Sequence, residues 1–464
     1  MNRPVELAAI ELPDFGRPTV QPGIERAEYE ARLQALRARA VQRGLDALVV
    51  YADREHMANM AYLTGFDPRF EEALLVVVGQ RLPTLVLGNE CWAYSMLSPL
   101  ALERRLYQHF SLLGQDRSKS APLDQILVEA GLTAGMRVGV VDWKYYGPEA
   151  GPGAADWISA PAYLAGLLRQ ITGQAPANAT DLLMNPHDGL RAITSVDQLA
   201  CFEFAASHIS AALRRAILAL QPGVSELAAM EQARLNGLPL SMHPVLTGGE
   251  RAAMGLAGPS NRMLNIGEPL MMGLGVWGAL SARAGFLVHD AAELPANIRD
   301  YVPRLVAPYF ATIVEWYEHV GLGVTGGELY EIVQRGLGDP FFGISLNPGH
   351  LIHLDEWLNS PIYPGSSIAL VAGMALQVDV IPSTGGPYFS SNIEDGIALA
   401  DEPMRRDFAA RWPEAWSRIQ ARRAFMDQAL GIRLKPEVLP FSNLAAFLPP
   451  FLLSPGQAMR VRRS

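Results

Sequence analysis

The residues of this 464-residue chain best suited to chemistry are one histidine and two acids in its last third. His350 lies in NPGHLIH, Asp379 in GMALQVDVIP and Glu394 in SSNIEDG. Asp379 has hydrophobic neighbours on both sides, and an ionised carboxylate in such a setting is costly unless a cation or hydrogen bonds compensate it. One imidazole and two carboxylates are a normal ligand set for a divalent Mn, Fe, Co or Zn ion. These three residues are therefore the candidate catalytic and metal-binding group.

Two further residues are candidates for substrate binding. His353 follows His350 by three positions, and the preceding Pro-Gly pair favours a strand or loop, so His353 is expected in a pocket wall or in the core. Arg69 lies in DPRFEE, directly after YLTGF. A guanidinium is able to bind a carboxylate through two hydrogen bonds. The alternative is a surface loop in which Arg69 pairs with Glu71 or Glu72.

Composition excludes several classes of protein. Hydrophobic residues make up 49% of the chain and charged residues 18%, which excludes an intrinsically disordered chain. The net charge of −9 offers no basic surface for nucleic acid or for a membrane. Cys91 and Cys201 provide neither a disulfide framework nor a cysteine zinc site, and the acidic N-terminus does not resemble a signal peptide. We therefore expect a cytoplasmic protein that binds neither nucleic acid nor membrane.

Strand and helix patterns alternate over the first part of the chain, which predicts an α/β domain over residues 1–185. A stretch rich in Pro, Asn and Asp, 175–189, is the expected boundary. The predicted helices are 27–43, 119–131 and 161–173, and the predicted strands are 45–52, two within 73–88, and 136–143.

The second domain, residues 190–464, contains an internal echo. Ser225 and Thr325 lie 100 residues apart, each after Gly-Val and each at the expected start of a short helix. A long helix precedes each of them (197–220 and 299–320), and apolar strands follow. Matching order and spacing predict two α+β halves related by a pseudo-two-fold axis, although this helix start is also common by chance. Residues 403–464 form a C-terminal extension whose apolar, proline-rich part is expected to pack against other parts of the protein.

At this point the motifs resemble the creatinase/prolidase/methionine aminopeptidase superfamily, which is the peptidase M24 or "pita-bread" group. YLTGF is similar to the N-terminal domain of its prolidase- and creatinase-like members. Gly349–His350 resembles the family's GH, Gly373–Met374 its GM, Asp379 the Glu of its EP segment, and Glu394–Asp395 its ED. The resemblance implies an α/β N-terminal domain followed by an α+β pita-bread domain, and a homodimer.

The chain also departs from the family pattern. Gly273 and Ala284 stand where the resemblance implies two aspartate metal ligands. The upstream catalytic histidine falls on Gly255 or Leu256, and a later histidine falls near Trp357. A two-metal peptidase needs both aspartates to hold its first ion and to bridge the pair. Only the ligands of the second ion remain, and Asp379 is one methylene shorter than the usual Glu.

Three interpretations of the site stay open: a mononuclear metal site, a metal-free cleft in which the trio binds substrate, and a vestigial site. The resemblance implies a creatinase/aminopeptidase-like hydrolase that cleaves a C–N or related bond of a small carboxylate-bearing molecule. It would use no metal or one divalent ion. His350 would polarise or bind, Glu394 would be the base or a ligand, and Arg69 of a neighbouring subunit would orient the substrate. The alternative is a non-catalytic pita-bread protein that binds a peptide or small molecule.

Overall fold

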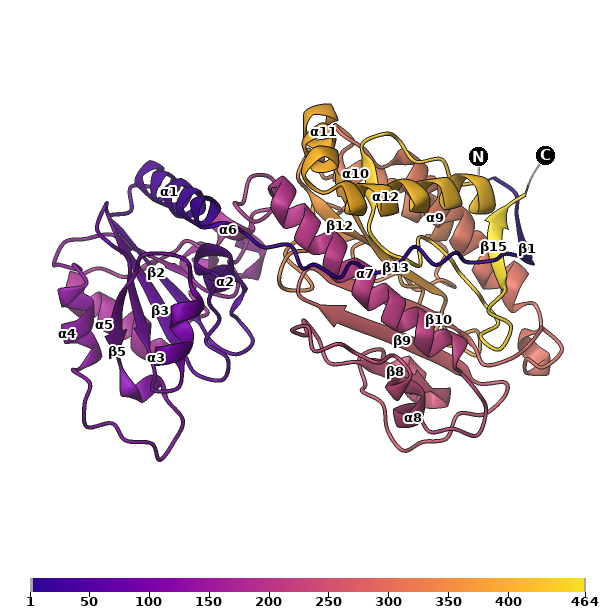
Figure 1. Cartoon of the computed structure of the whole chain (residues 1–464), viewed down its shortest axis with the longest axis horizontal. Helices are drawn as coiled ribbons and strands as arrows, with labels where there is room; N and C mark the ends of the chain where they lie inside the picture. The colour runs from indigo at the N-terminus through magenta and orange to yellow at the C-terminus, as the bar shows by residue number, and fades with distance from the viewer. Residues whose placement is uncertain (1–2, 463–464) are drawn as a thin grey trace. The chain divides into compact units, whose positions relative to one another are not determined.

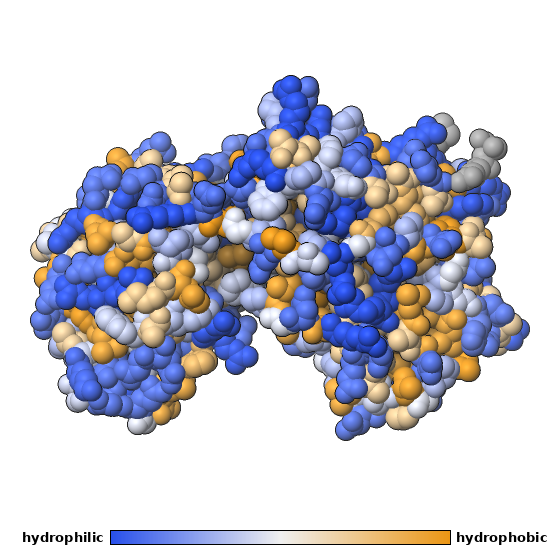
Figure 2. Space-filling view, in the orientation of Figure 1, coloured by the Kyte–Doolittle hydropathy of each residue, from blue (hydrophilic) through white to orange (hydrophobic). Residues whose placement is uncertain are grey.

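The computed structural model describes residues 3–462, so the outermost residues of both predicted domains lie outside it. The chain forms two compact units (Figure 1). The small unit is Ile24–Ala192, and the large unit combines the chain up to Gly23 with the chain from Ile193 onward. Within residues 3–462, no helix has both the length and the apolar character needed to cross a membrane. Figure 2 shows hydrophobic side chains reaching the surface in groups among hydrophilic ones, as is usual for folded domains.

A six-stranded sheet forms the centre of the small unit, in the order β5-β4-β3-β2-β6-β7. β2 pairs antiparallel with β3 and parallel with β6. Because helices cover both faces, the central strands are apolar at every position rather than alternating. The strands are β2 (Ala47–Ala52), β3 (Ala73–Val78), β4 (Thr84–Leu87), β5 (Glu103–Leu106), β6 (Val138–Val141) and β7 (Ala177–Asn178).

Three helices of the small unit match the predicted ones. Apolar side chains of α4 and α5, among them Leu127 and Leu164, share one core with Val49 and Val76 of the sheet. Neither α2 nor β5 was predicted, because every residue of α2 is buried and β5 is charged, so neither shows a regular apolar period. The helices are α1 (Arg26–Gln42), α2 (Ala58–Thr64), α3 (Cys91–Tyr94), α4 (Leu123–Glu129), α5 (Ala162–Thr172) and α6 (Asp181–Met184).

The large unit is built on a seven-stranded antiparallel sheet in the order β11-β12-β13-β10-β9-β8, with β14 paired to β13. A two-residue turn, Trp277–Gly278, joins β9 to β10, and Gly278 has φ +88°, which glycine adopts without strain. The strands are β8 (Val245–Gly248), β9 (Pro269–Val276), β10 (Ala279–Phe286), β11 (His350–Leu351), β12 (Ala375–Asp379), β13 (Asn392–Leu399) and β14 (Val438–Pro440).

Helices cover this sheet, and α7 runs along β9 and β10 (Figure 1). The side chain of Ser195 accepts a hydrogen bond from the amide of Gln198 and so begins α7 at the predicted place. The predicted helix 299–320 starts with a π-helical turn at 302–306 before α9. The helices are α7 (Val196–Leu218), α8 (Glu226–Glu231), α9 (Ala307–His319), α10 (Gly326–Leu337), α11 (Glu402–Arg411) and α12 (Pro413–Phe425).

The internal repeat is visible in the backbone hydrogen bonds around the two predicted helix starts. Ser225 caps α8 and Thr325 caps α10, each accepting from the amide three residues later. Each half then repeats the same three bonds to a segment between its first two strands, β8 and β9 in one half and β11 and β12 in the other. The bonds run from the amides of Gly223, Glu226 and Leu227 to Leu264, Arg262 and Ser260, and from those of Gly323, Gly326 and Gly327 to Leu370, Ile368 and Ser366. The two halves share one pattern of backbone hydrogen bonds, which confirms the predicted α+β duplication.

Both ends of the described chain belong to the large unit. β1 (Val5–Ala9) pairs with β15 (Gln457–Val461), and Figure 1 shows the indigo N-terminal segment crossing the large unit to reach β15. Residues up to Gly23, which the sequence analysis assigned to the first domain, therefore fold with the second. The apolar part of the C-terminal extension is buried as expected, with Leu444, Leu448 and Leu452 almost inaccessible to solvent.

Candidate functional site

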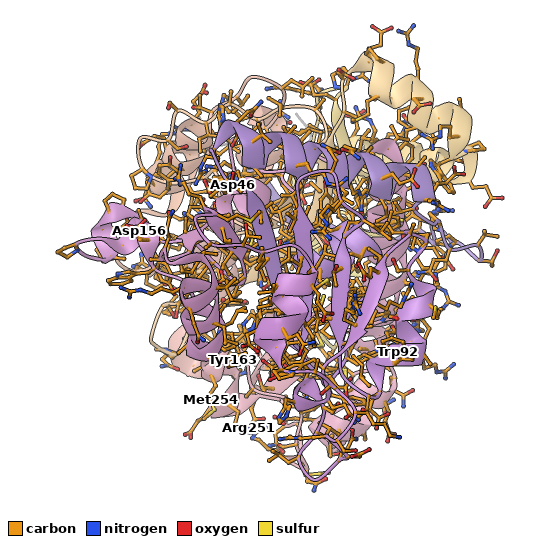
Figure 3. The ribbon with its side chains drawn as sticks, turned by 90° about the vertical axis from the view of Figure 1, so that its left-hand side faces the viewer. Asp46, Trp92, Asp156, Tyr163, Arg251 and Met254 are labelled. Carbon is orange, nitrogen blue, oxygen red and sulfur yellow. The ribbon has the colours of Figure 1, made fainter. Side chains whose placement is uncertain are left out.

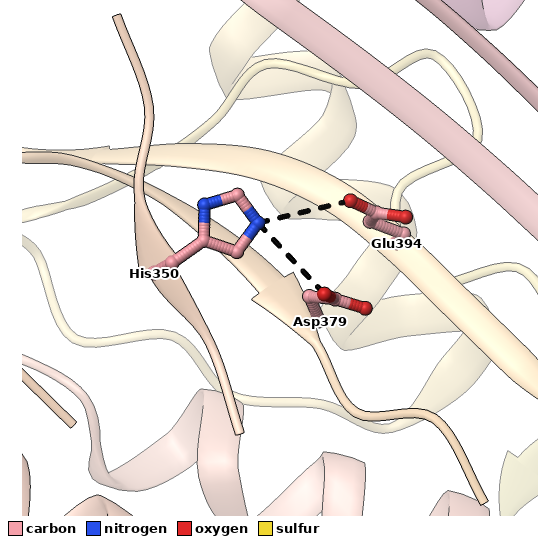
Figure 4. A group of neighbouring side chains, drawn as sticks. All are labelled: His350, Asp379 and Glu394. Carbon is pink, nitrogen blue, oxygen red and sulfur yellow. Dashed lines mark ion pairs between the residues drawn. The ribbon is translucent and has the colours of Figure 1, made fainter. Parts of the chain in front are cut away.

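The predicted trio forms one compact group inside the large unit (Figure 4). His350 Nε2 lies 3.8 Å from Asp379 Oδ2 and 3.9 Å from Glu394 Oε1. One ligand atom from each residue lies within 4.8 Å of the others, and all three side chains are buried. The structure thus brings together residues that are up to 44 positions apart in the sequence.

Strand register explains why the three side chains meet. Asp379, at the end of β12, lies directly opposite Glu394 of β13. His350 of β11 lies opposite Gln377, two residues before Asp379. Directly opposed residues, and residues two apart on one strand, point to the same face of a sheet. All four side chains therefore project from one face.

The glycine of the GH motif allows the turn that aims His350 at this face. Gly349 has φ +119°, and a Cβ there would lie 3.0 Å from both the carbonyl oxygen of Gln377 and Ile362 Cδ1. Only glycine combines that backbone conformation with such close packing. The glycine of this motif thus allows the backbone to place His350 on this face.

Two contacts hold the imidazole of His350, and one of them indicates which ring nitrogen carries the proton. Its Nδ1 donates a hydrogen bond to the carbonyl of Leu351 at 3.1 Å, which leaves the lone pair of Nε2 directed at the acids. The indole of Trp357 stacks on the ring, with centroids 4.1 Å apart and planes 18° from parallel. Trp357 stands near the position where the sequence comparison expected a histidine, and here it fixes the plane of His350.

The electrostatics of the acids indicate a need for positive charge. Burial, reinforced by the carboxylate of Glu394, raises the pKa of Asp379 well above its usual value. Burial also raises the pKa of Glu394 well above its usual value, with Glu356 and Asp395 adding to the effect. Two buried carboxylates side by side cannot both ionise cheaply without a compensating cation.

The donor atoms fit a divalent cation. Among the described residues, His350 Nε2 and Asp379 Oδ1 are buried and have no hydrogen-bond partner. Ligand atoms that lie about 2.0–2.2 Å from a common ion are separated by about 3–4 Å, as His350 Nε2 is from the two acids. The residues present therefore suit one ion with nitrogen and oxygen ligands.

A fourth polar residue that the sequence analysis missed lies beside the trio. Glu356 Oε1 is 3.7 Å from His350 Nε2. Burial raises the pKa of Glu356, while His350 acts in the opposite direction. In the sequence it stands in HLDEWLN, which reads as an ordinary polar loop, so only the folded loop reveals its position.

The opposite face of the sheet carries a buried ion pair that supports the site. Asp395, the second residue of the ED motif, points away from Glu394 and accepts a hydrogen bond from Arg283 Nη2 at 2.7 Å. Arg283 is fully buried and also donates to the carbonyls of Phe447 and Glu394. It thereby joins β10, β13 and the C-terminal segment directly behind the trio. Neither Arg283 nor Asp395 was among the residues predicted to form the site.

The two positions that lack the expected aspartates lie on the same face as the trio. Gly273 is opposite Ala282, which is itself opposite Glu394, and Ala284 is opposite Asn392. Asn392 is fully buried, and neither its amide nitrogen nor its amide oxygen has a partner among the described residues. A Cβ at Gly273 would make ordinary contacts, the nearest being Ala282 Cβ at 3.6 Å. The face thus continues as small residues with one unpaired amide.

The other predicted histidine positions have distinct surroundings. Leu256 is an exposed loop residue, 73% accessible, and its carbonyl accepts a hydrogen bond from His243 Nε2. His353 is fully buried and packs edge-to-face on Phe202 of α7, with ring centroids 5.1 Å apart. Its Nδ1 accepts a hydrogen bond from the amide of Leu354. Its surroundings are those of a core side chain, which is one of the two settings expected for it.

Arg69 belongs to the small unit and is held in an unusual conformation. Its φ is +56°, a strained value for a residue other than glycine. The guanidinium stacks over Tyr94 of α3 at 5.0 Å and lies 3.6 Å from Asp67, which is its partner instead of Glu71 or Glu72. Figure 3 labels Trp92 in the same short helix. The side chain remains 53% exposed, so its hydrogen-bonding edge is accessible.

Comparisons with known proteins agree with this architecture. Residues 32–138 match the family described as the creatinase/prolidase N-terminal domain. The dipeptidase PepE from Mycobacterium ulcerans has a similar structure, with a TM-score of 0.60 and 22% identity over 83% of this chain and 95% of that one. No curated protein matches the sequence significantly.

Two further solved structures are similar. For the Xaa-Pro dipeptidase from Bacillus anthracis, the TM-score is 0.60 and the identity 15%, over 81% of this chain and 96% of that one. For the prolidase from Pyrococcus horikoshii OT3, the TM-score is 0.61 and the identity 14%, over 80% of this chain and 95% of that one. The fold is thus an α/β domain followed by a pita-bread domain. The sequence motifs, the matched N-terminal domain and these structures thus agree on a creatinase/prolidase-like fold.

Proposed function

We propose that this protein is a hydrolase of the creatinase/prolidase type that cleaves a C–N or related bond in a small carboxylate-bearing molecule. The convergence of His350, Asp379 and Glu394 carries the proposal. These side chains are buried on one face of a curved sheet, and they include donor atoms with no partner among the described residues. Buried polar atoms without a partner are costly for stability, so a function that uses these atoms explains their presence.

The site would hold at most one divalent metal ion, bound by His350, Asp379 and Glu394. Such an ion, when bound, supplies Lewis acidity toward a substrate oxygen. Nε2 of His350 presents a lone pair because Nδ1 carries the proton. Where no ion is bound, Glu394 is instead proposed as the base that accepts a proton from the attacking water, since burial raises the pKa of this carboxyl group.

The similar proteins support the substrate class. The three solved structures above are named as dipeptidases or a prolidase, so a dipeptide or a comparable small amide is proposed as the substrate. Arg69 is proposed to bind its carboxylate, because its guanidinium is exposed and pre-oriented on Tyr94. We further propose a homodimer in which Arg69 of one subunit serves the site of the other.

One observation favours a second candidate function. Gly273 and Ala284 provide no carboxylate where a two-metal peptidase needs two. A non-catalytic protein that binds a peptide or small molecule in the same site would tolerate their loss.

A combined metal and activity measurement distinguishes the two functions. Elemental analysis of the purified chain, followed by assays with a panel of dipeptides that includes Xaa-Pro, tests the hydrolase directly. We expect about one ion per chain and hydrolysis that is lost in His350→Ala and Glu394→Gln. Glu402→Gln, an exposed acid at the start of α11, is the matched control and should behave like the wild type. Ligand binding without turnover, unaffected by metal removal, would instead establish the second function.

A further inference from the structure

Three carboxylates surround a single nitrogen in this site. The distances from His350 Nε2 to Glu356, Asp379 and Glu394 are 3.7, 3.8 and 3.9 Å. Each is too long for a hydrogen bond, and Nε2 has no hydrogen-bond partner among the described residues. Among the described residues, the ligand atoms of His350, Asp379 and Glu394 all lie within 4.8 Å of one another, and Glu356 approaches this group at His350 Nε2.

The loop that carries Glu356 is fastened to the strand that carries His350. The amide of Leu351 donates to the carbonyl of Asn359 at 2.7 Å, and the amide of Leu358 returns to Leu351 at 3.0 Å. These bonds close the loop immediately beyond β11. Trp357 then stacks on the imidazole, so its neighbour Glu356 is held against the same ring. The position of Glu356 is therefore built into the fold.

Glu356 also approaches the site from its open side. Its side chain is 32% exposed, whereas those of Asp379 and Glu394 are 6% and 7% exposed and that of His350 is inaccessible. The three strand residues supply three ligands, and an octahedral ion such as Mn²⁺ accepts one more acid and still leaves positions for water and substrate. Glu356 is placed to be that acid.

We propose that Glu356 is the fourth protein ligand of a single divalent cation, with His350, Asp379 and Glu394 as the other three. This inference rests on the proposed function, because it concerns the same mononuclear site. One neutral imidazole and three carboxylates form an oxygen-rich set, which suits Mn²⁺ and comparable hard or borderline ions. The fourth acid also compensates for the shorter Asp379 and for the missing acids at Gly273 and Ala284.

The rival explanation is that Glu356 only pairs electrostatically with a protonated His350. In that arrangement the acid would stabilise the imidazolium but contribute nothing to ion binding. A measurement of binding, independent of activity, separates the two explanations.

The experiment titrates Mn²⁺ into the metal-free full chain and measures free Mn²⁺ from its electron paramagnetic resonance signal. Glu356→Gln keeps the shape of the side chain and removes its charge, and we expect it to weaken Mn²⁺ binding at least about tenfold. Asp355→Asn removes the same charge one residue away and should bind within about threefold of the wild type. Quenching of Trp357 fluorescence by Co²⁺, absent in Trp357→Phe, reports whether the ion lies beside the stacked ring.

The outcomes distinguish this inference from the proposed function. If Glu356→Gln and Asp355→Asn both bind like the wild type while His350→Ala and Glu394→Gln do not, the ion site stands and Glu356 is not a ligand. If Glu356→Gln and Asp355→Asn weaken binding equally, the effect is one of general charge, and the inference again fails. If the wild type binds neither Mn²⁺ nor Co²⁺, the metal-dependent part of the proposed function falls together with it.

Discussion

Asp379 and Glu394 stand directly opposite each other on adjacent antiparallel strands, with their carboxyl groups on the same buried face. Like charges in this arrangement destabilise a sheet unless a cation lies between them. The relationship therefore couples the stability of the large unit to protons and to divalent ions.

The metal-free protein should lose stability as the pH rises. Burial raises the pKa of both Asp379 and Glu394 above the unfolded values, so the folded state binds these protons more tightly. Their contribution is fully present below the unfolded pKa, near about 4, and is lost as the pH rises through the folded pKa. Asp379→Asn should flatten this slope and stabilise the metal-free chain at about pH 7.5, by about 1.4 kcal/mol for each unit of raised pKa.

Urea unfolding with a chelator, measured between about pH 5 and about pH 8, checks this prediction. Added Mn²⁺ should reverse the order, so that the wild type becomes the more stable protein. An Asp379→Asn variant that is less stable than the wild type throughout the range, with chelator present, would contradict the raised pKa.

The Glu203 cluster should be essential for the stability of the large unit. Glu203 of α7 is buried and accepts hydrogen bonds from Arg418 and Arg422 of α12, and Arg422 is itself inaccessible. Burial alone would raise the pKa of Glu203, but Arg422 and Arg418 lower it below its usual value. Its contribution is therefore present above the unfolded pKa and lost as the pH falls through the folded one.

Glu203→Gln leaves a buried guanidinium without its charge partner and should cost about 3–5 kcal/mol at neutral pH. Glu414→Gln, on the exposed side of α12, should change the free energy of unfolding by about 0.5 kcal/mol or less. Chemical denaturation of both variants at about pH 7 provides the comparison. Equal stabilities would show that the arginines are compensated without Glu203.

Much of the fold was predictable because local patterns and tertiary structure agree. Helix α1 shows an apolar period on a charged background, and the hydroxyl groups of Ser225 and Thr325 begin helices where their spacing indicated. Where burial was complete, the pattern failed: all seven residues of α2 are buried, so no face of the helix is distinguishable in the sequence. The place of the first residues was also hidden, because β1 pairs with a strand more than 440 positions away.

The candidate site was predictable to the extent that it depends on strands. Asp379 attracts attention because its neighbours are apolar, and the period of two along β13 would also have indicated Asn392, on the face of Glu394. Glu356 was beyond such reasoning, since its loop acquires meaning only when two backbone bonds fold it over His350. Arg283 and Asp395 escaped notice because each looks like an ordinary charged residue until the register makes them partners.

Mixed dimers should test the proposed role of Arg69. Arg69→Ala removes the exposed guanidinium, and His350→Ala disables the candidate metal site. If the subunits share sites, a mixture of the two inactive variants should recover up to about a quarter of wild-type activity, because one of the two sites in half of the dimers is intact. Activity after refolding the two variants together gives the measurement. No recovery, with mixed dimers demonstrated by a tag on one variant, would refute the shared site.

Restoring acids at Gly273 and Ala284 should change the metal content. Gly273 has ordinary packing around its missing Cβ, and Ala284 faces Asn392, whose amide nitrogen has no partner among the described residues. An aspartate at 284 would accept a hydrogen bond from that amide and so avoid much of the cost of burial. We therefore expect Gly273→Asp/Ala284→Asp to fold and to raise the metal content from about one to about two ions per chain.

The matched control is Gly273→Asn/Ala284→Asn, which adds nearly the same volume without charge and should keep the metal content of the wild type. Elemental analysis after dialysis against Mn²⁺ measures both variants, and thermal melting confirms that they are folded. Ala284→Asp alone should fold stably, because the amide of Asn392 can donate a hydrogen bond to the new carboxylate. Adding Asn392→Leu should destabilise this variant, because the carboxylate then loses its donor. If the Gly273→Asp/Ala284→Asp variant folds but binds no additional ion, the part of this face formed by Gly273 and Ala284 does not provide a second metal site.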